Sequence, residues 1–145
     1  MERQEFYQPK GAGREAFELV AENLKKEQGK SFFRGFVVRE FVPLRVVRDG
    51  PKEYPRCEEY RLFFWRGQLL SVSHYHEEKE EPIPVEQFVA VAQRFDSPFF
   101  SMDVAKSVAG RWLIVDMGAG ECTRLPPNLK PDLFYRRLFA GTSHS

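Results

Sequence analysis

Two aspartates in the second half of the chain are spaced so that they could bind a cation together. Asp103 lies in a run over 99–108 and Asp116 in a run over 111–117, and both runs are rich in β-branched and aromatic residues, as strands are. The residues between the runs, Ala109-Gly110, predict a two-residue hairpin turn. A symmetric turn of that length places Asp103 directly opposite Asp116.

Two facing carboxylates on one side of a sheet repel each other unless a positive charge lies between them. Oxygen ligands without clustered Cys or His favour a hard cation such as Mg²⁺, which takes one or two carboxylates and completes its shell with water and substrate phosphates. Alternatively, one aspartate is exposed at a strand end or pairs with Lys106 or Arg111. The residues alone leave both interpretations open.

A second hairpin is predicted over 56–75, with its turn at Arg66-Gly67. The register of a two-residue turn places Glu59, Arg61 and His74 on one face, which is apolar near the turn. Charges on such a face either pair with one another or point into a pocket. Glu59 and Arg61 therefore form either a structural ion pair or part of a site.

The remaining chain supplies helices and one more strand. Apolar residues at helical spacing predict helices over 14–27 and 85–95, and a final helix begins near Pro131. The β-branched run over 32–44 predicts a strand. The order of these elements predicts an α+β fold, an antiparallel sheet of about five strands with helices packed against it.

Length and composition limit the domain count, the partners and the compartment. A chain of 145 residues suits one domain, and we expect a loose leading segment over 1–13, one lobe over 14–140 and a disordered tail over 141–145. The net charge of +1 gives no overall attraction to nucleic acid or to a membrane surface. Cys57 and Cys122 are too few for a disulfide framework, and no apolar run is long enough to span a membrane, so we expect a cytoplasmic protein.

Five blocks of sequence, taken in order, resemble the C-terminal lobe of an ATP-grasp domain: VVREFVPL, EYRLFFWRG, FFSMDVA, RWLIVDMGAGECTRLP and LFYRRL. The resemblance covers most of 14–138 and points to the clade of small ATP-grasp proteins that are RNA-ligase-like or peptide-ligase-like. ATP-grasp enzymes hold ATP between two α+β lobes and usually phosphorylate a carboxylate to an acylphosphate, which a nucleophile then attacks. The resemblance thus implies an ATP- and Mg²⁺-binding lobe of an ATP-dependent ligase. Its acceptor would be a small molecule, a peptide or an RNA end.

The resemblance also assigns residues to the nucleotide. Glu40, Phe41 and Val42 match the hinge strand whose backbone reads the adenine. Glu59 and Arg61 match an acidic-x-Arg strand in which the arginine meets the phosphates or the acylphosphate oxygens, a task that suits a planar, permanently charged fork. Arg61 is therefore also the candidate catalytic residue.

The metal ligands implied by the resemblance are Asp103 and Asp116, the first and second acids of the family, in agreement with the facing geometry. Two positions differ from the family pattern. Gly118 stands where many ATP-grasp proteins have a ligating Asn, and Ala119 stands where members of the clade have an acid. Glu121 is the nearest carboxylate that could compensate.

Two other function classes compete with the ligase lobe. One is a non-catalytic interaction module that keeps the fold and forms a homodimer, or binds a chain supplying the missing lobe, through an apolar surface. The other is a metal-dependent nuclease of the paired-acid type, which is disfavoured because such sites have a lysine two residues after the second acid, where this chain has Gly118. Titration with ATP, with and without Mg²⁺, separates these classes.

Overall fold

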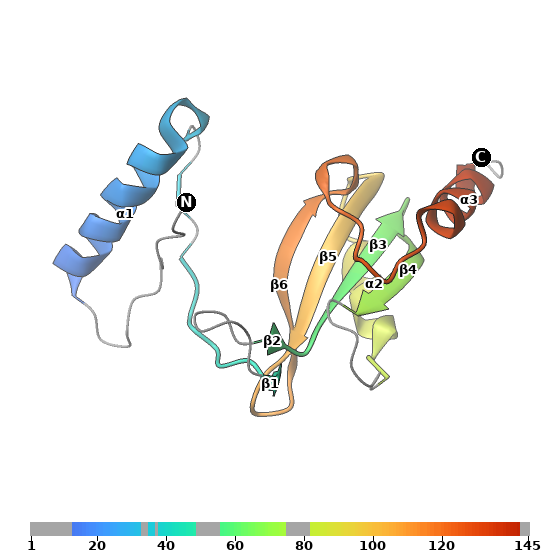
Figure 1. Ribbon diagram of the computed structural model, residues 1–145, viewed down its shortest axis with the longest axis horizontal. Helices are drawn as coiled ribbons and strands as arrows, with labels where there is room; N and C mark the ends of the chain where they lie inside the picture. Colours follow the sequence, from blue (N-terminus) through green and yellow to red (C-terminus); the bar gives the residue numbers. More distant parts are fainter. Residues whose placement is uncertain (1–12, 33–34, 37, 49–55, 75–81, 143–145) are drawn as a thin grey trace. The chain divides into compact units, whose positions relative to one another are not determined.

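The structure, a computed structural model, describes residues 13–32, 35–36, 38–48, 56–74 and 82–142. The chain divides into two compact units, 1–42 and 43–145, and each is described by itself (Figure 1). The single lobe expected over 14–140 stays a prediction.

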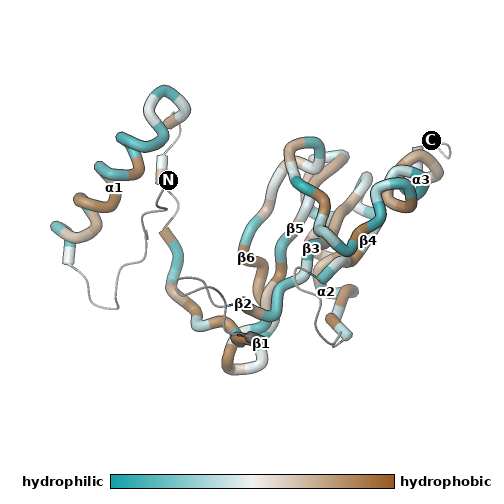
Figure 2. Tube along the Cα trace, in the orientation of Figure 1, coloured by the Kyte–Doolittle hydropathy of each residue, from teal (hydrophilic) through white to brown (hydrophobic). Residues whose placement is uncertain are grey.

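The first unit contains the predicted N-terminal helix. Helix α1 (Arg14–Gln28) is followed by a short 3-10 helix, η1 (Gly29–Ser31). Figure 2 shows hydrophobic and hydrophilic residues alternating along α1, as the predicted apolar stripe requires. Within that stripe Ala21 is buried, and the ring of Phe17 meets the ring of Phe36 edge-on at a centroid distance of 6.2 Å. The helix ends at a glycine with φ of 50°, a conformation that favours glycine.

The strand predicted over 32–44 is wrong for the described residues. Those between 32 and 43 belong to no helix or strand, and Leu44 forms only an isolated bridge to Ser107. A β-branched run favours an extended backbone, but a strand also requires a neighbouring strand to receive its hydrogen bonds. Such pairing starts at Pro43, whose carbonyl accepts a hydrogen bond from the N–H of Val108.

The second unit is built on an antiparallel sheet of four strands in the order β4-β3-β5-β6. These strands are β3 (Glu59–Trp65), β4 (Gln68–His74), β5 (Phe99–Lys106) and β6 (Trp112–Ala119). A separate ladder joins β1 (Val46–Arg48) to β2 (Arg56–Cys57). Both predicted hairpins are present and the α+β class is confirmed, with four strands in one sheet and two in another where the sequence predicted about five in one.

The turn between β5 and β6 is longer than predicted. The N–H of Ser107 donates to the carbonyl of Arg111, and Gly110 has φ of 78°, so three residues rather than two connect the strands. Consequently Val104 faces Ile114 and not Val115.

A bulge restores the predicted register one position further along. The pairing shifts between Asp103 and Val104, and Val115 is the additional residue on β6. Beyond the bulge Asp103 faces Asp116, as the sequence predicted. Two departures from the ideal hairpin thus cancel at the two aspartates.

The β3–β4 hairpin also contains a bulge, and here it overturns a prediction. Near the turn the register is as predicted, but it shifts in the middle of β4, so that His74 faces Tyr60 rather than Glu59. A shift of one residue moves a side chain to the other side of a sheet. His74 is accordingly buried with its ring 4.1 Å from the ring of Tyr60, away from the face that carries Glu59 and Arg61.

Helices pack on both faces of the sheet. Helix α2 (Val85–Ala92) is shorter than the predicted 85–95, and its buried side chains join a core drawn from the even-numbered residues of β3 and β5: Tyr60, Leu62, Phe64, Phe88, Ala92, Phe100, Met102 and Val104.

Helix α3 (Pro131–Thr142) begins where predicted and extends two residues into the segment expected to be a tail. Its buried Phe134 packs against Phe63 and Phe99 at ring-centroid distances of 4.8 and 6.4 Å. Because Phe63 and Phe99 alternate with core residues along their strands, α3 lies on the opposite face of the sheet from α2. In the described part of the chain, no helix has both the length and the apolar character to cross a membrane.

Candidate functional site

One residue from each of three neighbouring strands forms a line of charges across the face of the sheet that α3 partly covers. Arg61 on β3 faces Asp103 on β5, which in turn faces Asp116 on β6. Residues directly opposite each other in antiparallel strands share a face and lie close together. We refer to Arg61, Asp103 and Asp116 as the charged row.

Within the charged row, Arg61 holds Asp103 with a two-pronged ion pair. Nε donates to Oδ1 at 2.7 Å and Nη2 donates to Oδ2 at 2.6 Å. The two side chains are only 11% and 13% exposed, so these charge-assisted bonds are protected from water. The sequence did not indicate this partner for either residue, since it suggested Glu59 for Arg61 and Lys106 or Arg111 for Asp103.

Arg61 also ties the segment after β6 to the sheet. Its Nη1 donates to the backbone carbonyl of Arg124 at 2.7 Å. One residue earlier, the hydroxyl of Thr123 lies 2.8 Å from the hydroxyl of Ser101 on β5. Figure 1 shows this segment leaving β6 through the 3-10 helix η2 (Gly120–Cys122) and passing over the sheet toward α3. Sequence reasoning missed Arg124, Thr123 and Ser101, because no local pattern reports a contact between segments so far apart in the chain.

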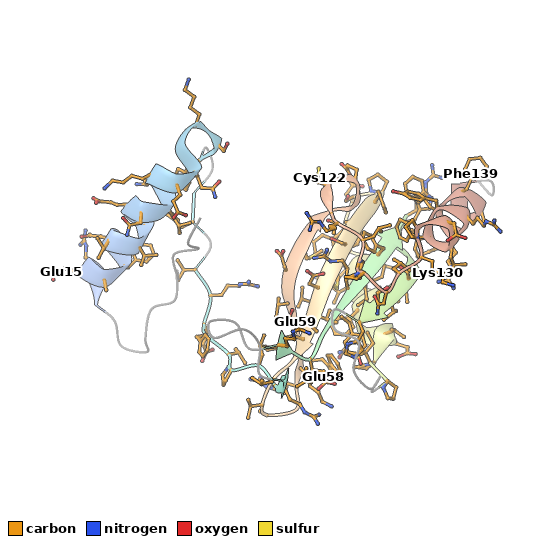
Figure 3. All side chains as sticks on the ribbon, in the orientation of Figure 1. Glu15, Glu58, Glu59, Cys122, Lys130 and Phe139 are labelled. Atoms are coloured by element: carbon orange, nitrogen blue, oxygen red, sulfur yellow. The ribbon has the colours of Figure 1, made fainter. Side chains whose placement is uncertain are left out.

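Glu59 lies two residues before Arg61 on β3 and therefore on the same face as the charged row; Figure 3 labels it at the start of the strand. Burial raises the pKa of the Glu59 carboxyl, the charge of Asp103 raises it further, and Arg61 partly offsets both effects. No ion pair of the described residues includes Glu59. This face thus holds an excess of negative charge.

Asp116 is the accessible end of the charged row. Its side chain is exposed, and its Oδ1 accepts a hydrogen bond from the N–H of Met117 at 2.9 Å. An aspartate at the surface whose other oxygen has no described hydrogen bond is well placed to meet a ligand arriving from solvent.

The residues of this face fit a magnesium ion that is carried by a nucleotide. Three carboxylates accompany one guanidinium, all oxygen donors suit a hard cation, and Asp103 has lone pairs beyond the two that Arg61 uses. The part of the chain that the structure describes holds no group of three or more His, Cys, Asp or Glu residues suited to a metal ion. Two carboxylate ligands, with water and phosphates in the other positions, is the usual arrangement for Mg²⁺.

The structure gives a reason why Gly118 replaces the family's asparagine. A Cβ at Gly118 would lie 3.0 Å from Oγ1 of Thr123 and 3.4 Å from Oγ of Ser101. The hydroxyl pair that anchors the segment after β6 therefore occupies the space that a longer side chain would need. Ala119, where the clade has an acid, is exposed at the end of β6.

The predicted adenine contacts belong to the first unit. Glu40 and Phe41 are exposed and Val42 is partly buried, and all three lie in the segment that forms no strand. Their role stays a prediction, as do the roles of Glu59, Arg61, Asp103 and Asp116 toward a ligand.

Comparison with known proteins identifies the family. A family model for an ATP-grasp domain, described as the third family of its clade, matches residues 3–138, which is nearly the whole chain. No curated protein and no solved structure matches the chain. The resemblance found in the sequence blocks is confirmed, and with it a general ATP-grasp function that includes binding of ATP. This chain belongs to the ATP-grasp domains, in the clade family that the matching model represents.

Proposed function

We propose that the charged row and Glu59 bind the phosphate chain of ATP together with Mg²⁺, as part of a ligase that activates a carboxylate or a similar acceptor. The observation that supports this most directly is the row itself. Asp103 and Asp116 face each other across adjacent strands, and the single described cation between the carboxylates is already bound to one of them.

The side chains of the charged row divide the work. Asp103 is oriented by the two-pronged contact of Arg61, so its oxygens stay in place without reorganisation when a ligand binds. Asp116 is exposed and completes the acidic pair from the neighbouring strand. When bound, the ion would neutralise charge on the phosphates and stabilise the transferring phosphoryl group.

The nearest cysteine does not favour a covalent intermediate on the protein. Burial raises the pKa of the Cys57 thiol, and the nearby charge of Glu59 raises it further. A thiol that keeps its proton is a poor nucleophile. We therefore propose that phosphoryl transfer goes directly to a bound acceptor.

The remaining parts of the proposal concern the rest of the ligand. Glu40, Phe41 and Val42 would contact the adenine, and the acceptor would be a small molecule, a peptide or an RNA end. A partner chain or a second copy would supply the other lobe, and the setting would be the cytoplasm. These assignments rest on the family resemblance.

The proposal is tested by titrating ATP calorimetrically, with Mg²⁺ and with a chelator, into the wild type and into Asp116→Asn. Asp116 is exposed, so the variant removes a charge without disturbing the core. We expect binding that depends on Mg²⁺ in the wild type and affinity at least about tenfold lower in the variant, the loss of one charge-assisted contact. A matched control is Asp96→Asn, an exposed aspartate in the loop after α2, which should bind as the wild type does.

Two results would contradict the proposal. Unchanged affinity in Asp116→Asn would remove the acidic pair from the nucleotide site. If the wild type binds no ATP at all, with or without Mg²⁺, the protein is better explained as an interaction module that keeps the fold.

A further inference from the structure

The guanidinium of Arg61 is engaged inside the protein. Nε and Nη2 are bound to Asp103 and Nη1 to the carbonyl of Arg124, all at 2.6 to 2.7 Å, and the residue is 9% exposed. Moving this group toward a ligand would break three short hydrogen bonds and leave the buried carboxylate of Asp103 without its counter-charge. Such a step is strongly unfavourable. The geometry therefore suits Arg61 to hold other groups in place.

A phosphate chain on this face would require a further cation. Glu59, Asp103 and Asp116 contribute three carboxylates, and Arg61 balances only one of them. A divalent ion compensates for the other two, which leaves the negative charge of the phosphates still to be met. An arginine is the usual protein group for this task, since its fork matches phosphate oxygens.

Arg124 is the cation that Arg61 itself brings to the charged row. The carbonyl of Arg124 is one of the three acceptors of Arg61, so the backbone of Arg124 is fixed beside the row. The side chain of Arg124 is exposed, and no ion pair of the described residues includes it. Its long stem allows the guanidinium to reach past its own backbone.

The orientation of the neighbouring residue agrees with an accessible Arg124 side chain. Thr123 has extended backbone angles, φ of −92° and ψ of 129°, and its hydroxyl is turned to Ser101 on the sheet. In an extended backbone consecutive side chains point to opposite sides. With Thr123 directed inward, Arg124 extends away from the packed side of its segment, where a ligand could meet it.

We propose that Arg124 contacts the phosphate chain of the nucleotide, and that Arg61 is a positioning residue that holds both Asp103 and the segment carrying Arg124. This inference rests on the proposed function, because it assigns a residue to the same ligand. It differs from the role that the family resemblance gives to Arg61, which is direct contact with the phosphates.

The first test compares the binding of ATP and AMP, in the presence of Mg²⁺, to the wild type and to Arg124→Gln. Loss of a charge-assisted contact should weaken ATP binding by about 10- to 100-fold. The affinity for AMP should stay within about twofold, because AMP lacks the terminal phosphates and a change of that size is within the scatter of independent sites. Arg124→Lys keeps the charge and should recover most of the ATP affinity.

The control for charge is Arg94→Gln. Arg94 is exposed and follows α2, which packs on the opposite face of the sheet. This variant should bind ATP as the wild type does. The unfolding midpoints of Arg124→Gln and Arg94→Gln should both match the wild type, since both side chains are exposed.

The second test separates a positioning role of Arg61 from a direct contact. Arg61→Lys keeps the positive charge but loses the fork, so the segment of Arg124 is no longer held, and ATP binding should weaken. Adding Arg124→Gln to that background should then produce less than about twofold further loss, because the two residues act as a unit. Losses that add fully would show that Arg61 meets the ligand independently and would overturn the positioning role.

The outcomes for Arg124 are distinct from those for the proposed function. If the wild type binds ATP and Arg124→Gln binds it equally well, the inference about Arg124 is wrong and the proposed function stands. An equal loss of ATP and AMP affinity would likewise overturn a phosphate contact. If the wild type does not bind ATP, the proposed function fails first, and the inference fails with it.

Discussion

At the residue scale, the ion pair between Arg61 and Asp103 is the contact on which the site depends. It joins β3 to β5 across the face of the sheet and is almost fully removed from water. A buried pair of this kind contributes little compared with an apolar pair, but removing one partner is costly because the other charge is left unpaired. The site residues are therefore coupled to folding.

We predict that Asp103→Asn lowers the free energy of unfolding by about 3 to 5 kcal/mol, since it leaves the guanidinium of Arg61 buried without a counter-charge. Urea unfolding followed by tryptophan fluorescence measures the change. The control Asp96→Asn, at an exposed position, should stay within about 0.5 kcal/mol of the wild type. Equal stability of the two variants would mean that the pair is not held as the structure shows.

Glu59 should make the stability depend on pH. Its pKa is raised in the folded protein above the ordinary value of 4.5, so the folded state keeps this proton to a higher pH than the unfolded state does. The resulting stability is complete below the unfolded pKa and is lost as the pH rises through the folded pKa. At neutral pH the Glu59 carboxylate therefore opposes folding.

The substitution Glu59→Gln removes this charge. We expect the variant to be more stable than the wild type at about pH 8 and no more stable below about pH 4, where both side chains are neutral in both states. Urea midpoints measured across that range test the prediction. Glu121→Gln, at an exposed position, serves as the control and should show no such trend, and an equal gain at both pH values would contradict the explanation.

At the scale of elements, α3 covers one end of the site face through a single buried aromatic residue. Phe134 is 2% exposed and packs against Phe63 on β3, whereas Phe139 on the same helix is 76% exposed. The two phenylalanines thus provide a matched pair for testing how α3 is held.

Phe134→Ala should lower the free energy of unfolding by about 3 to 5 kcal/mol, the usual result of emptying a buried aromatic position. Phe139→Ala, which removes the same atoms from a mostly exposed position, should change it by no more than about 0.5 kcal/mol. Chemical unfolding followed by circular dichroism gives both values. A comparable loss in both variants would show that α3 packs through a different side.

At the scale of the whole molecule, the division into two units separates the predicted adenine contacts from the charged row. Glu40, Phe41 and Val42 lie in the first unit, and the entire core cluster on β3, β5 and α2 lies in the second. A domain with its own hydrophobic core can fold alone.

A chain limited to residues 43–145 should therefore unfold cooperatively, as measured by tryptophan fluorescence. It should also lose the preference for ATP over inorganic tripolyphosphate that we expect of the full chain, because it lacks the adenine contacts and keeps the charged row. Competition binding with both ligands, in the presence of Mg²⁺, tests this. If the short chain prefers ATP as strongly as the full chain, Glu40, Phe41 and Val42 do not read the adenine.

Much of the second unit could be predicted from the sequence because its information is local. The two hairpins follow from β-branched runs separated by glycine-containing turns, and the helices α2 and α3 follow from their apolar spacing. The facing of Asp103 and Asp116 was predicted from turn length alone, although a longer turn and a bulge cancelled to produce it. Bulges are not visible in local patterns, and for the same reason the position of His74 was predicted wrongly.

The sequence by itself therefore determined the α+β class, the family and the pair of facing aspartates, since turns and strand periodicity act between residues that are close along the chain. Only the tertiary structure decided that Arg61 binds Asp103 and holds the carbonyl of Arg124, contacts that span 42 and 63 residues. It also showed that the described residues before Pro43 form no strand. The physical reason is the same in each case, because pairing between distant segments depends on which backbones the whole fold brings together.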